Sequence, residues 1–136
     1  MQAEIIKPKS QAHALIMGLL GWLVPGAGHI LQGKWTRGAL LGASVILMFL
    51  CGMQFGGRLY SVFGFADGLL HGAFGAFNLG SGVLYLVCWL GEVGFTDLGR
   101  AERITFEYGN TMMMVAGLMN YLSVLDAYDV AVGRKQ

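Results

Sequence analysis

The charged residues of this chain are spaced so that four long stretches contain no aspartate, glutamate, lysine or arginine. These stretches are residues 10–33, 38–57, 68–91 and 108–125. A helix needs about 20 mostly apolar residues to cross a hydrocarbon core about 30 Å thick, and each stretch is close to that length. The pattern therefore predicts an all-α transmembrane bundle of four helices, near residues 11–32, 37–56, 67–92 and 110–132.

Helix-capping residues support these boundaries. Side chains that can accept hydrogen bonds from the free amides of a helix start stand near the beginning of each stretch: Ser10, Thr36, Asp67 and Asn110. Gly133 follows the fourth predicted helix, where a left-handed residue is favourable, and Arg134 and Lys135 suit the negative helix end. Residues 97–107 mix charged and apolar residues at helical spacing, so we expect them to lie at the membrane interface.

The first predicted helix contains a break. Pro25 lacks an amide hydrogen and clashes with the preceding turn, and Gly26 and Gly28 follow it closely. Two readings remain open. Either the helix kinks at Pro25, or the segment turns back as a re-entrant piece that neighbouring helices cover, because unpaired backbone is too costly in contact with lipid.

The distribution of basic residues compares these two readings. With four complete spans, the lysines and arginines divide five to four between the two sides, which is no bias. With a re-entrant first segment they divide six to three: Lys7, Lys9, Lys34, Arg37, Arg100 and Arg103 against Arg58, Arg134 and Lys135. Because cytoplasmic loops carry the excess of positive charge, the second reading is slightly favoured, with the Lys34 loop cytoplasmic.

The composition agrees with a membrane protein. Hydrophobic residues make up 55% of the 136 residues, and charged residues only 12%, compared with about 25% in ordinary soluble proteins. The net charge of +1 gives no indication of nucleic-acid binding. No nucleophile with a base at suitable spacing and no metal-ligand motif is present, so we expect neither an enzyme nor a metal site. We expect residues 1–136 to form one transmembrane domain, in a bacterial inner membrane.

Small residues recur at intervals of four in the predicted helices. Such ladders let helix backbones approach closely in lipid, where apolar burial supplies no drive between helices. The positions are Gly38 and Gly42 in the second helix, and Gly64, Gly68, Gly72, Ala76 and Gly80 around the third. We expect these faces to pack helices together, either inside the bundle or against another subunit or a second copy.

Polar residues of the last helix have two expected roles. Asn120 lies in the middle of the helix, where its amide is expected to bond to a neighbouring helix. Asp126 and Asp129 lie near the end of the helix and are expected to reach the headgroup region beside Arg134.

Two histidines are candidate cofactor-binding residues. His29 stands at the break in the first helix, where it could ligate a haem or chlorin metal, accept a proton, or satisfy carbonyls that Pro25 leaves free. We favour the last of these roles. His71 stands four residues after Asp67 and could touch it on one helix face, although Asp67 is also explained as a helix cap.

Two resemblances bear on the fold. Residues 23–29 (LVPGAGH), followed by Gly33, Lys34, Arg37 and Gly38 before an apolar helix, resemble the opening hairpin of small bacterial proteins of the two-transmembrane-domain family. The closing runs, residues 106–110 (FEYGN), 116–120 (AGLMN), 125–129 (LDAYD) and 133–135 (GRK), are similar to a bacterial family of unknown function found in acidobacteria-like genomes. These resemblances imply a fold and a membrane location, but no activity.

The leading functional hypothesis is a non-enzymatic accessory or structural subunit, packed by its glycine faces in a larger membrane complex or on itself. The first alternative is a cofactor-binding or proton-handling subunit that uses His29, His71 and Asp67. The second is a small transporter that uses the broken first helix as a substrate cradle, but no paired broken helix is evident in the sequence.

Overall fold

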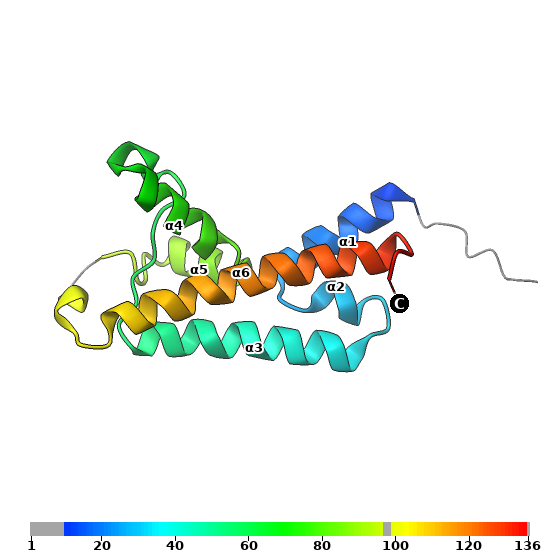
Figure 1. Cartoon of the computed structure of the whole chain (residues 1–136), viewed down its shortest axis with the longest axis horizontal. Helices are drawn as coiled ribbons and strands as arrows, with labels where there is room; N and C mark the ends of the chain where they lie inside the picture. The colour runs from blue at the N-terminus through cyan, green and yellow to red at the C-terminus, as the bar shows by residue number, and fades with distance from the viewer. Residues whose placement is uncertain (1–9, 97–98, 136) are drawn as a thin grey trace, which may run out of the picture.

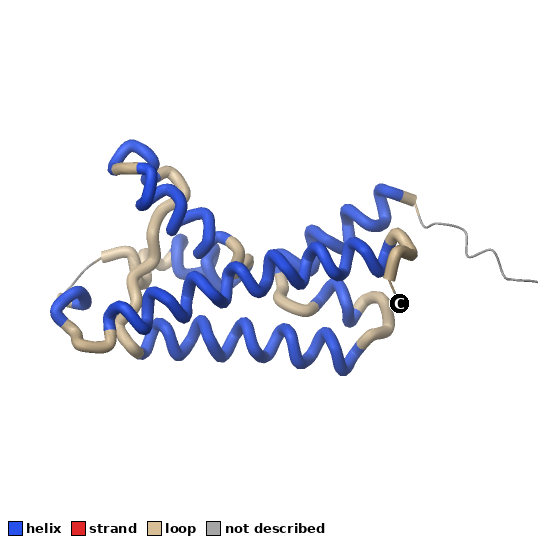
Figure 2. Tube along the Cα trace, in the orientation of Figure 1, coloured by secondary structure: helices blue, strands red, loops and turns tan. Residues whose placement is uncertain are grey.

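The computed structural model describes residues 10–96 and 99–135, and every regular element in them is helical (Figures 1 and 2). The elements in chain order are α1 (Gln11–Leu23), α2 (Ala27–Ile30), α3 (Trp35–Gln54), the 3-10 turn η1 (Gly64–Asp67), α4 (Leu69–Leu79), α5 (Val83–Leu90), the 3-10 turn η2 (Arg100–Glu102) and α6 (Phe106–Ala131). The expected all-helical class is therefore confirmed, whereas the division into four continuous helices is not.

Two long helices form the axis of the molecule. α3 and α6 run side by side in opposite directions along its longest dimension (Figure 1). Val45 and Phe49 of α3 are buried with Met113 and Ala116 of α6. Near one end the two backbones approach so closely that a Cβ atom on Gly52 would overlap α6, which is the close packing that small residues allow between helices.

The first segment folds back on itself at Pro25. α1 ends at Leu23, and Gly26 adopts a left-handed conformation (φ +84°) that starts α2. A Cβ atom on Gly28 would lie 2.8 Å from the carbonyl oxygen of Met17. A continuous helix would separate residues 17 and 28 by about 16 Å, so α2 must return along α1. The structure therefore has the break expected at Pro25, in the form of a hairpin rather than a kink.

The third predicted helix is also broken, which the sequence reading missed. Instead of one helix over residues 67–92, the chain forms η1, α4 and α5, with an angle of 116° between α4 and α5. The bend needs a glycine because Gly82 has φ +61° and ψ −123°, a conformation that a side chain disfavours. The molecule thus contains a second bent segment beside the one formed by α1 and α2 (Figure 2).

The helix ends agree with the capping predictions in part. Ser10 Oγ accepts a hydrogen bond from the His13 amide at 3.3 Å, and Gly133 follows α6 with φ +80°, both as predicted. Asp67 ends η1 instead of capping α4, which follows Gly68. Asn110 lies inside α6, four residues after its first residue, and accepts a hydrogen bond from the amide of Arg58 instead.

The helix starts and the predicted interfacial segment also differ from expectation. α3 begins at Trp35, before Thr36, and its cap position is Lys34, whose side chain makes no capping bond. Of residues 97–107, residues 97 and 98 lie outside the described residues, η2 covers 100–102, and α6 has begun by residue 106.

By length and hydropathy, α3 is the helix of the described residues that could cross a membrane. The bent pair α4 and α5 would count as a second if it formed one span, and α1 is apolar but shorter. Four spans are therefore not established. α6 has 26 residues, but buried polar side chains such as Asn110, Asn120 and Ser123 interrupt its apolar sequence.

Candidate functional site

The two bent segments meet against the middle of α6, at Asn120. Its side-chain nitrogen Nδ2 donates to the carbonyl oxygen of Trp22 at 3.0 Å and to that of Gly80 at 2.8 Å. The Trp22 indole Nε1 donates to the carbonyl oxygen of Leu79 at 3.0 Å. The last carbonyls of a helix have no partner within it, so these bonds satisfy the ends of α1 and α4 away from water. We call this meeting point the junction.

Glycines allow the backbones to approach at the junction. A Cβ atom on Gly82 would overlap the carbonyl oxygen of Trp22, and one on Gly117 would overlap that of Phe77. Gly80 packs directly on the backbone of Gly117. The end of α1 is therefore in backbone contact with the turn that follows α4, and the end of α4 is in backbone contact with α6.

Several polar atoms at the junction and at the adjoining end of α4 have no hydrogen-bond partner. They are the Asn120 oxygen Oδ1, the Ser81 hydroxyl and both amide atoms of Asn78. Asn120 and Ser81 are 0% exposed and Asn78 is 1% exposed. Because Asn120 Nδ2 faces two carbonyls, its Oδ1 must be the atom that is left without a donor. Unpartnered buried groups are uncommon in proteins, which makes this region the first candidate site.

A second polar cluster lies where α2 meets the start of α3 and the end of α6. His29 Nε2 and Asp126 Oδ2 are 2.8 Å apart, Arg37 Nε is 3.4 Å from the same oxygen, and Lys135 Nζ contacts Asp126 Oδ1. His29 is fully buried, and its Nδ1 has no partner. Gln32 fastens α2 to α6 by donating to the Ala127 carbonyl at 3.0 Å.

The charges in this cluster act on Asp126. Lys135 and His29 hydrogen-bond to its carboxylate, and Arg37 Nε lies 3.4 Å from Oδ2. Asp126 thus contacts three surrounding basic groups. A groove of about 460 Å³ opens beside it, with walls that are mostly apolar: Leu40, Leu41, Met119, Leu122 and Ser123, with Arg37 and Asp126 at its charged end.

Residues 16–136 match a family of unknown function, DUF6677. The chain belongs to the DUF6677 family. No curated protein and no solved structure matches it. The expectation of an uncharacterised family is thereby confirmed, whereas the link to acidobacteria and the similarity of the opening hairpin to the two-transmembrane-domain family stay predictions.

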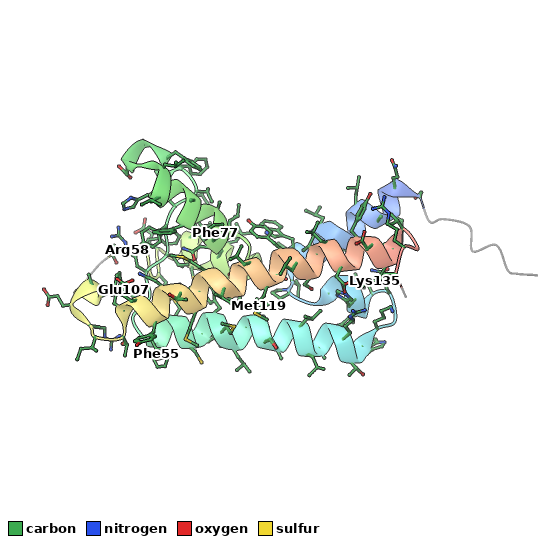
Figure 3. The ribbon with its side chains drawn as sticks, viewed as in Figure 1. Phe55, Arg58, Phe77, Glu107, Met119 and Lys135 are labelled. Carbon is green, nitrogen blue, oxygen red and sulfur yellow. The ribbon has the colours of Figure 1, made fainter. Side chains whose placement is uncertain are left out.

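At the opposite end of this DUF6677 protein, three arginines donate hydrogen bonds to backbone carbonyls. Arg100 donates to the Gly57 carbonyl at 3.0 Å, Arg103 to the Gln54 carbonyl at 3.4 Å, and Arg58 to the Phe95 carbonyl at 3.2 Å. Cations are favourable at the negative end of a helix, and α3 ends here. Figure 3 shows Arg58 at this end and Lys135 at the other.

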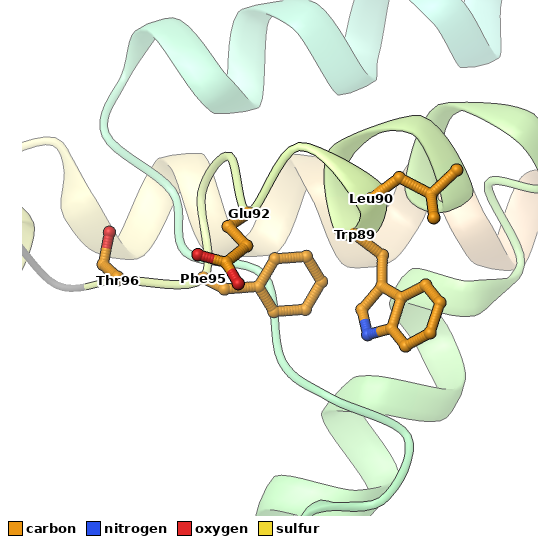
Figure 4. A pocket seen from close by; sticks show the side chains of 5 residues that line it. All are labelled: Trp89, Leu90, Glu92, Phe95 and Thr96. Carbon is orange, nitrogen blue, oxygen red and sulfur yellow. The ribbon is translucent and has the colours of Figure 1, made fainter.

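A further pocket of about 410 Å³ lies beside the loop that follows α5 (Figure 4). Its lining combines aromatic and polar side chains: Trp89, Leu90, Glu92, Phe95 and Thr96. Glu92 is the one ionisable group among these lining residues.

The structure separates the two histidines proposed for a cofactor. His29 lies in α2 with Asp126, whereas His71 lies exposed on α4, its ring 5.6 Å from that of Tyr60 in an edge-on contact. α2 and the outer end of α4 stand far apart in Figure 1. Among the described residues, moreover, no three His, Cys, Asp or Glu side chains gather as metal ligands would. The two histidines therefore do not form one ligand pair in this DUF6677 protein.

The glycines proposed for helix packing are used within the chain, but not as one ladder. Gly38 and Gly42 pack on the turn around Pro25 and Gly26. The remaining positions fall on different elements: Gly64 beside His71, Gly68 at the start of α4, Gly72 against the Phe65 ring and Gly80 on Gly117. The repeat does not give one continuous face because the helix is interrupted at Gly68, between η1 and α4, where φ is +134°.

Sequence reasoning predicted a helix contact for Asn120 but missed the partner of Asp126. Asp126 was expected to reach the headgroup region beside Arg134, yet it bonds to His29, 97 residues away in the sequence. Arg134 lies 3.5 Å from Asp129 instead. The run Gly80, Ser81, Gly82 inside an apolar stretch was a usable signal of the second bend, because two glycines there weaken a helix.

Proposed function

We propose that this DUF6677 protein is a non-enzymatic integral membrane protein, in which α3 and α6 cross the bilayer and the two bent segments enter it from opposite sides. One observation carries the proposal: the molecule exposes apolar side chains and buries polar ones. Leucines face outward on α1 (Leu15, Leu19), α3 (Leu40, Leu47, Leu50) and α6 (Leu118, Leu122, Leu125), whereas Asn78, Ser81 and Asn120 are buried. Large exposed apolar surfaces are typical of membrane contact.

The bent segments suit the membrane core because their irregular backbone is covered. Non-helical backbone is tolerated at membrane depth only where protein or a water-filled cavity satisfies it. Here Asn120 and Trp22 donate to the carbonyls at the tips of both bends. Asn120 is near the middle of α6, which has 26 residues and is therefore about 39 Å long, so the tips meet near the centre of the bilayer.

The described basic residues divide four to three between the two ends of the molecule. Lys34, Arg37, Arg134 and Lys135 belong to the end where α3 begins and α6 ends, and Arg58, Arg100 and Arg103 to the other. This differs from the sequence reading, because the second bend moves Arg100 and Arg103 to the side of Arg58. From the sequence, Lys7 and Lys9 were expected on the same side as Lys34, but both lie outside the described residues. A division of four to three sets no orientation, and the labelling experiment below decides which end faces the cytoplasm.

Within that membrane, we propose a role as an accessory or structural subunit. The glycine contacts hold the chain together internally, so a partner protein or a second copy would have to bind the exposed apolar surface. Purification in mild detergent tests this role. A complex larger than one chain is expected, and a monomer from native membranes would contradict it.

Cysteine labelling tests the membrane arrangement. In a chain with Cys51→Ala and Cys88→Ala, single cysteines are introduced as Thr36→Cys, Arg134→Cys or Glu102→Cys, at exposed positions. A membrane-impermeant maleimide applied to spheroplasts and to inverted vesicles should group position 36 with 134, and place 102 on the other side. Four complete spans would group 36 with 102, and recovery of the unmodified chain as a soluble protein would overturn the proposal entirely.

A second candidate function is transport, and the paired bends favour it. Many transporters hold their cargo between two broken helices near the bilayer midplane. The sequence reading ranked transport last because it found one broken helix, whereas the structure has two, with tips that meet at Asn120. Of the three groups expected for proton handling, His29 is buried against Asp126, whereas Asp67 and His71 are exposed. An absorption spectrum of the native protein tests the haem and chlorin alternative.

A further inference from the structure

We propose that the junction binds a monovalent alkali cation, held by the Asn120 and Asn78 side-chain oxygens, the Ser81 hydroxyl and the carbonyls at the ends of α1 and α4. This inference rests on the membrane placement above, because a polar site of this kind has most effect in a medium that supplies no competing water. It also names a ligand class, alkali cations, for the junction, which is the site that a transporter would use.

The first argument is the direction of the two helices. α1 has 13 residues and α4 has 11, and both end at the junction. The C-terminal end of a helix carries about half a negative charge, from carbonyls without partners in the helix. Two such ends brought together repel each other and attract a cation. In transporters, broken helices use the same ends to coordinate sodium ions.

The second argument is independent of the helix ends and concerns the unpartnered side chains. Asn120 Oδ1, Ser81 Oγ and Asn78 Oδ1 are oxygen atoms without a hydrogen-bond donor, on side chains that are at most 1% exposed. Asn120 Oδ1 belongs to the same amide group that bonds to the Trp22 and Gly80 carbonyls, so it lies at the meeting point itself. Asn78 and Ser81 lie within two residues of Gly80, whose carbonyl Asn120 contacts, so these acceptors without donors belong to the same helix end.

The donor set decides the charge and the kind of ion. Hard cations prefer oxygen ligands, whereas zinc and similar metals prefer nitrogen and sulfur. None of the junction side chains is a carboxylate, and a divalent ion among neutral ligands in a membrane core would remain largely uncompensated. A singly charged ion of the sodium or potassium type therefore fits these residues best.

The competing explanation is a buried water molecule, which often satisfies groups of this kind. A water donates hydrogen bonds to the same oxygens without any dependence on the salt present. The two explanations therefore differ in one measurable property: whether the stability of the folded protein depends on the identity of the cation at constant ionic strength.

The experiment measures thermal unfolding of the purified full chain in detergent. NaCl and KCl are each compared with choline chloride at equal ionic strength, over a range of concentrations. A ligand that binds only the folded protein raises the melting temperature in a saturable way, and a rise of about 3–6 °C in Na⁺ or K⁺ is expected. Direct binding of radiolabelled Na⁺ to the same preparation is measured in parallel.

Ser81→Ala is the decisive variant, because the Ser81 hydroxyl makes no hydrogen bond that its loss would break. If the residue is only structural, Ser81→Ala leaves stability unchanged or raises it, and any salt response persists. If it is a ligand, the melting temperature in choline is unchanged while the rise in Na⁺ or K⁺ falls by at least half. Ser44→Ala is the matched control, since the Ser44 hydroxyl makes an exposed hydrogen bond to the Leu40 carbonyl within α3.

The outcomes are distinguishable from failure of the membrane proposal. Equal melting temperatures in all three salts, or a rise that Ser81→Ala leaves intact, would overturn the cation site and leave the cysteine-labelling result standing. A soluble chain would overturn both. Asn78→Leu provides a second check, because both of its amide atoms lack partners and its loss should likewise remove the cation response without unfolding the protein.

Discussion

Replacing Asn120 by leucine should loosen the point where the two bent segments meet. Leucine branches at the same atom as asparagine but has no donor, so the carbonyls of Trp22 and Gly80 lose the bonds of 3.0 Å and 2.8 Å that they now receive. Both carbonyls remain buried. The tips of α1 and α4 would then have to separate or accept unsatisfied groups, and the junction is where the effect should begin.

The magnitude follows from the number of bonds. Side-chain hydrogen bonds between membrane helices contribute about 0.6 kcal/mol on average and up to about 1.7 kcal/mol. Two lost bonds therefore correspond to about 1–3 kcal/mol. The unpartnered Oδ1 of Asn120 is removed by the same change, which offsets part of this cost. We expect the free energy of unfolding to fall by about 1–3 kcal/mol.

The assay is thermal or SDS-induced unfolding of the purified protein, followed by circular dichroism. Thr111→Val is the matched control, because the Thr111 hydroxyl is exposed and bonds within its own helix to Glu107. A double-mutant cycle with Trp22→Phe, which removes the indole bond to Leu79, should show coupling of at least about 0.5 kcal/mol. The reasoning is refuted if Asn120→Leu lowers the free energy of unfolding no more than Thr111→Val does and its effect adds to that of Trp22→Phe.

Two further changes test packing and charge. Gly117→Ala should destabilise the protein by about 1–3 kcal/mol, because the new methyl group meets the Phe77 carbonyl, whereas Gly18→Ala, with its nearest neighbour 3.6 Å away, should be neutral or stabilising in the same unfolding assay. Asp126→Asn should cost about 1–3 kcal/mol near neutral pH, because buried His29 loses its charged partner. The same unfolding assay near neutral pH measures this loss, and equal stabilities of the wild type and Asp126→Asn would contradict a stabilising ion pair.

The two bends show what the sequence could and could not predict. Pro25 is a strong signal, because a proline inside a helix removes a hydrogen bond whatever surrounds it. The second bend depends on Gly80 and Gly82, which a helix tolerates at a cost of about 1 kcal/mol each. They indicate a weak point in the helix, but tertiary contacts fix the bend, with the Gly117 backbone against Gly80 and the Trp22 carbonyl against Gly82. The sequence thus indicates where the helix can break, and the contacts decide that it does.

The candidate site was predictable to the same limited extent. The position of Asn120 in the middle of a helix predicted a contact with another helix, and the structure provides two. Its partners are backbone carbonyls, which every residue has, so no side-chain pattern identifies them. His29 and Asp126 are 97 residues apart and were assigned separate roles. Their pairing depends on the fold, which brings α2 against the end of α6, and no local pattern in the sequence indicates it.

The sequence of α6 explains why hydropathy does not identify this helix as a candidate span. It packs against α1, α2, α3 and α4, so its buried residues point in several directions and leave no single apolar face. It also supplies the donor that irregular backbone needs, and the polar residue that does so lowers its hydropathy. On the proposed membrane placement, a helix between the two bent segments must carry such residues, because the carbonyls of the bends have no water to bond with. In this chain, the helix that packs against α1, α2, α3 and α4 is therefore not identified as a span by hydropathy, because residues such as Asn120, which joins the two bends, are polar.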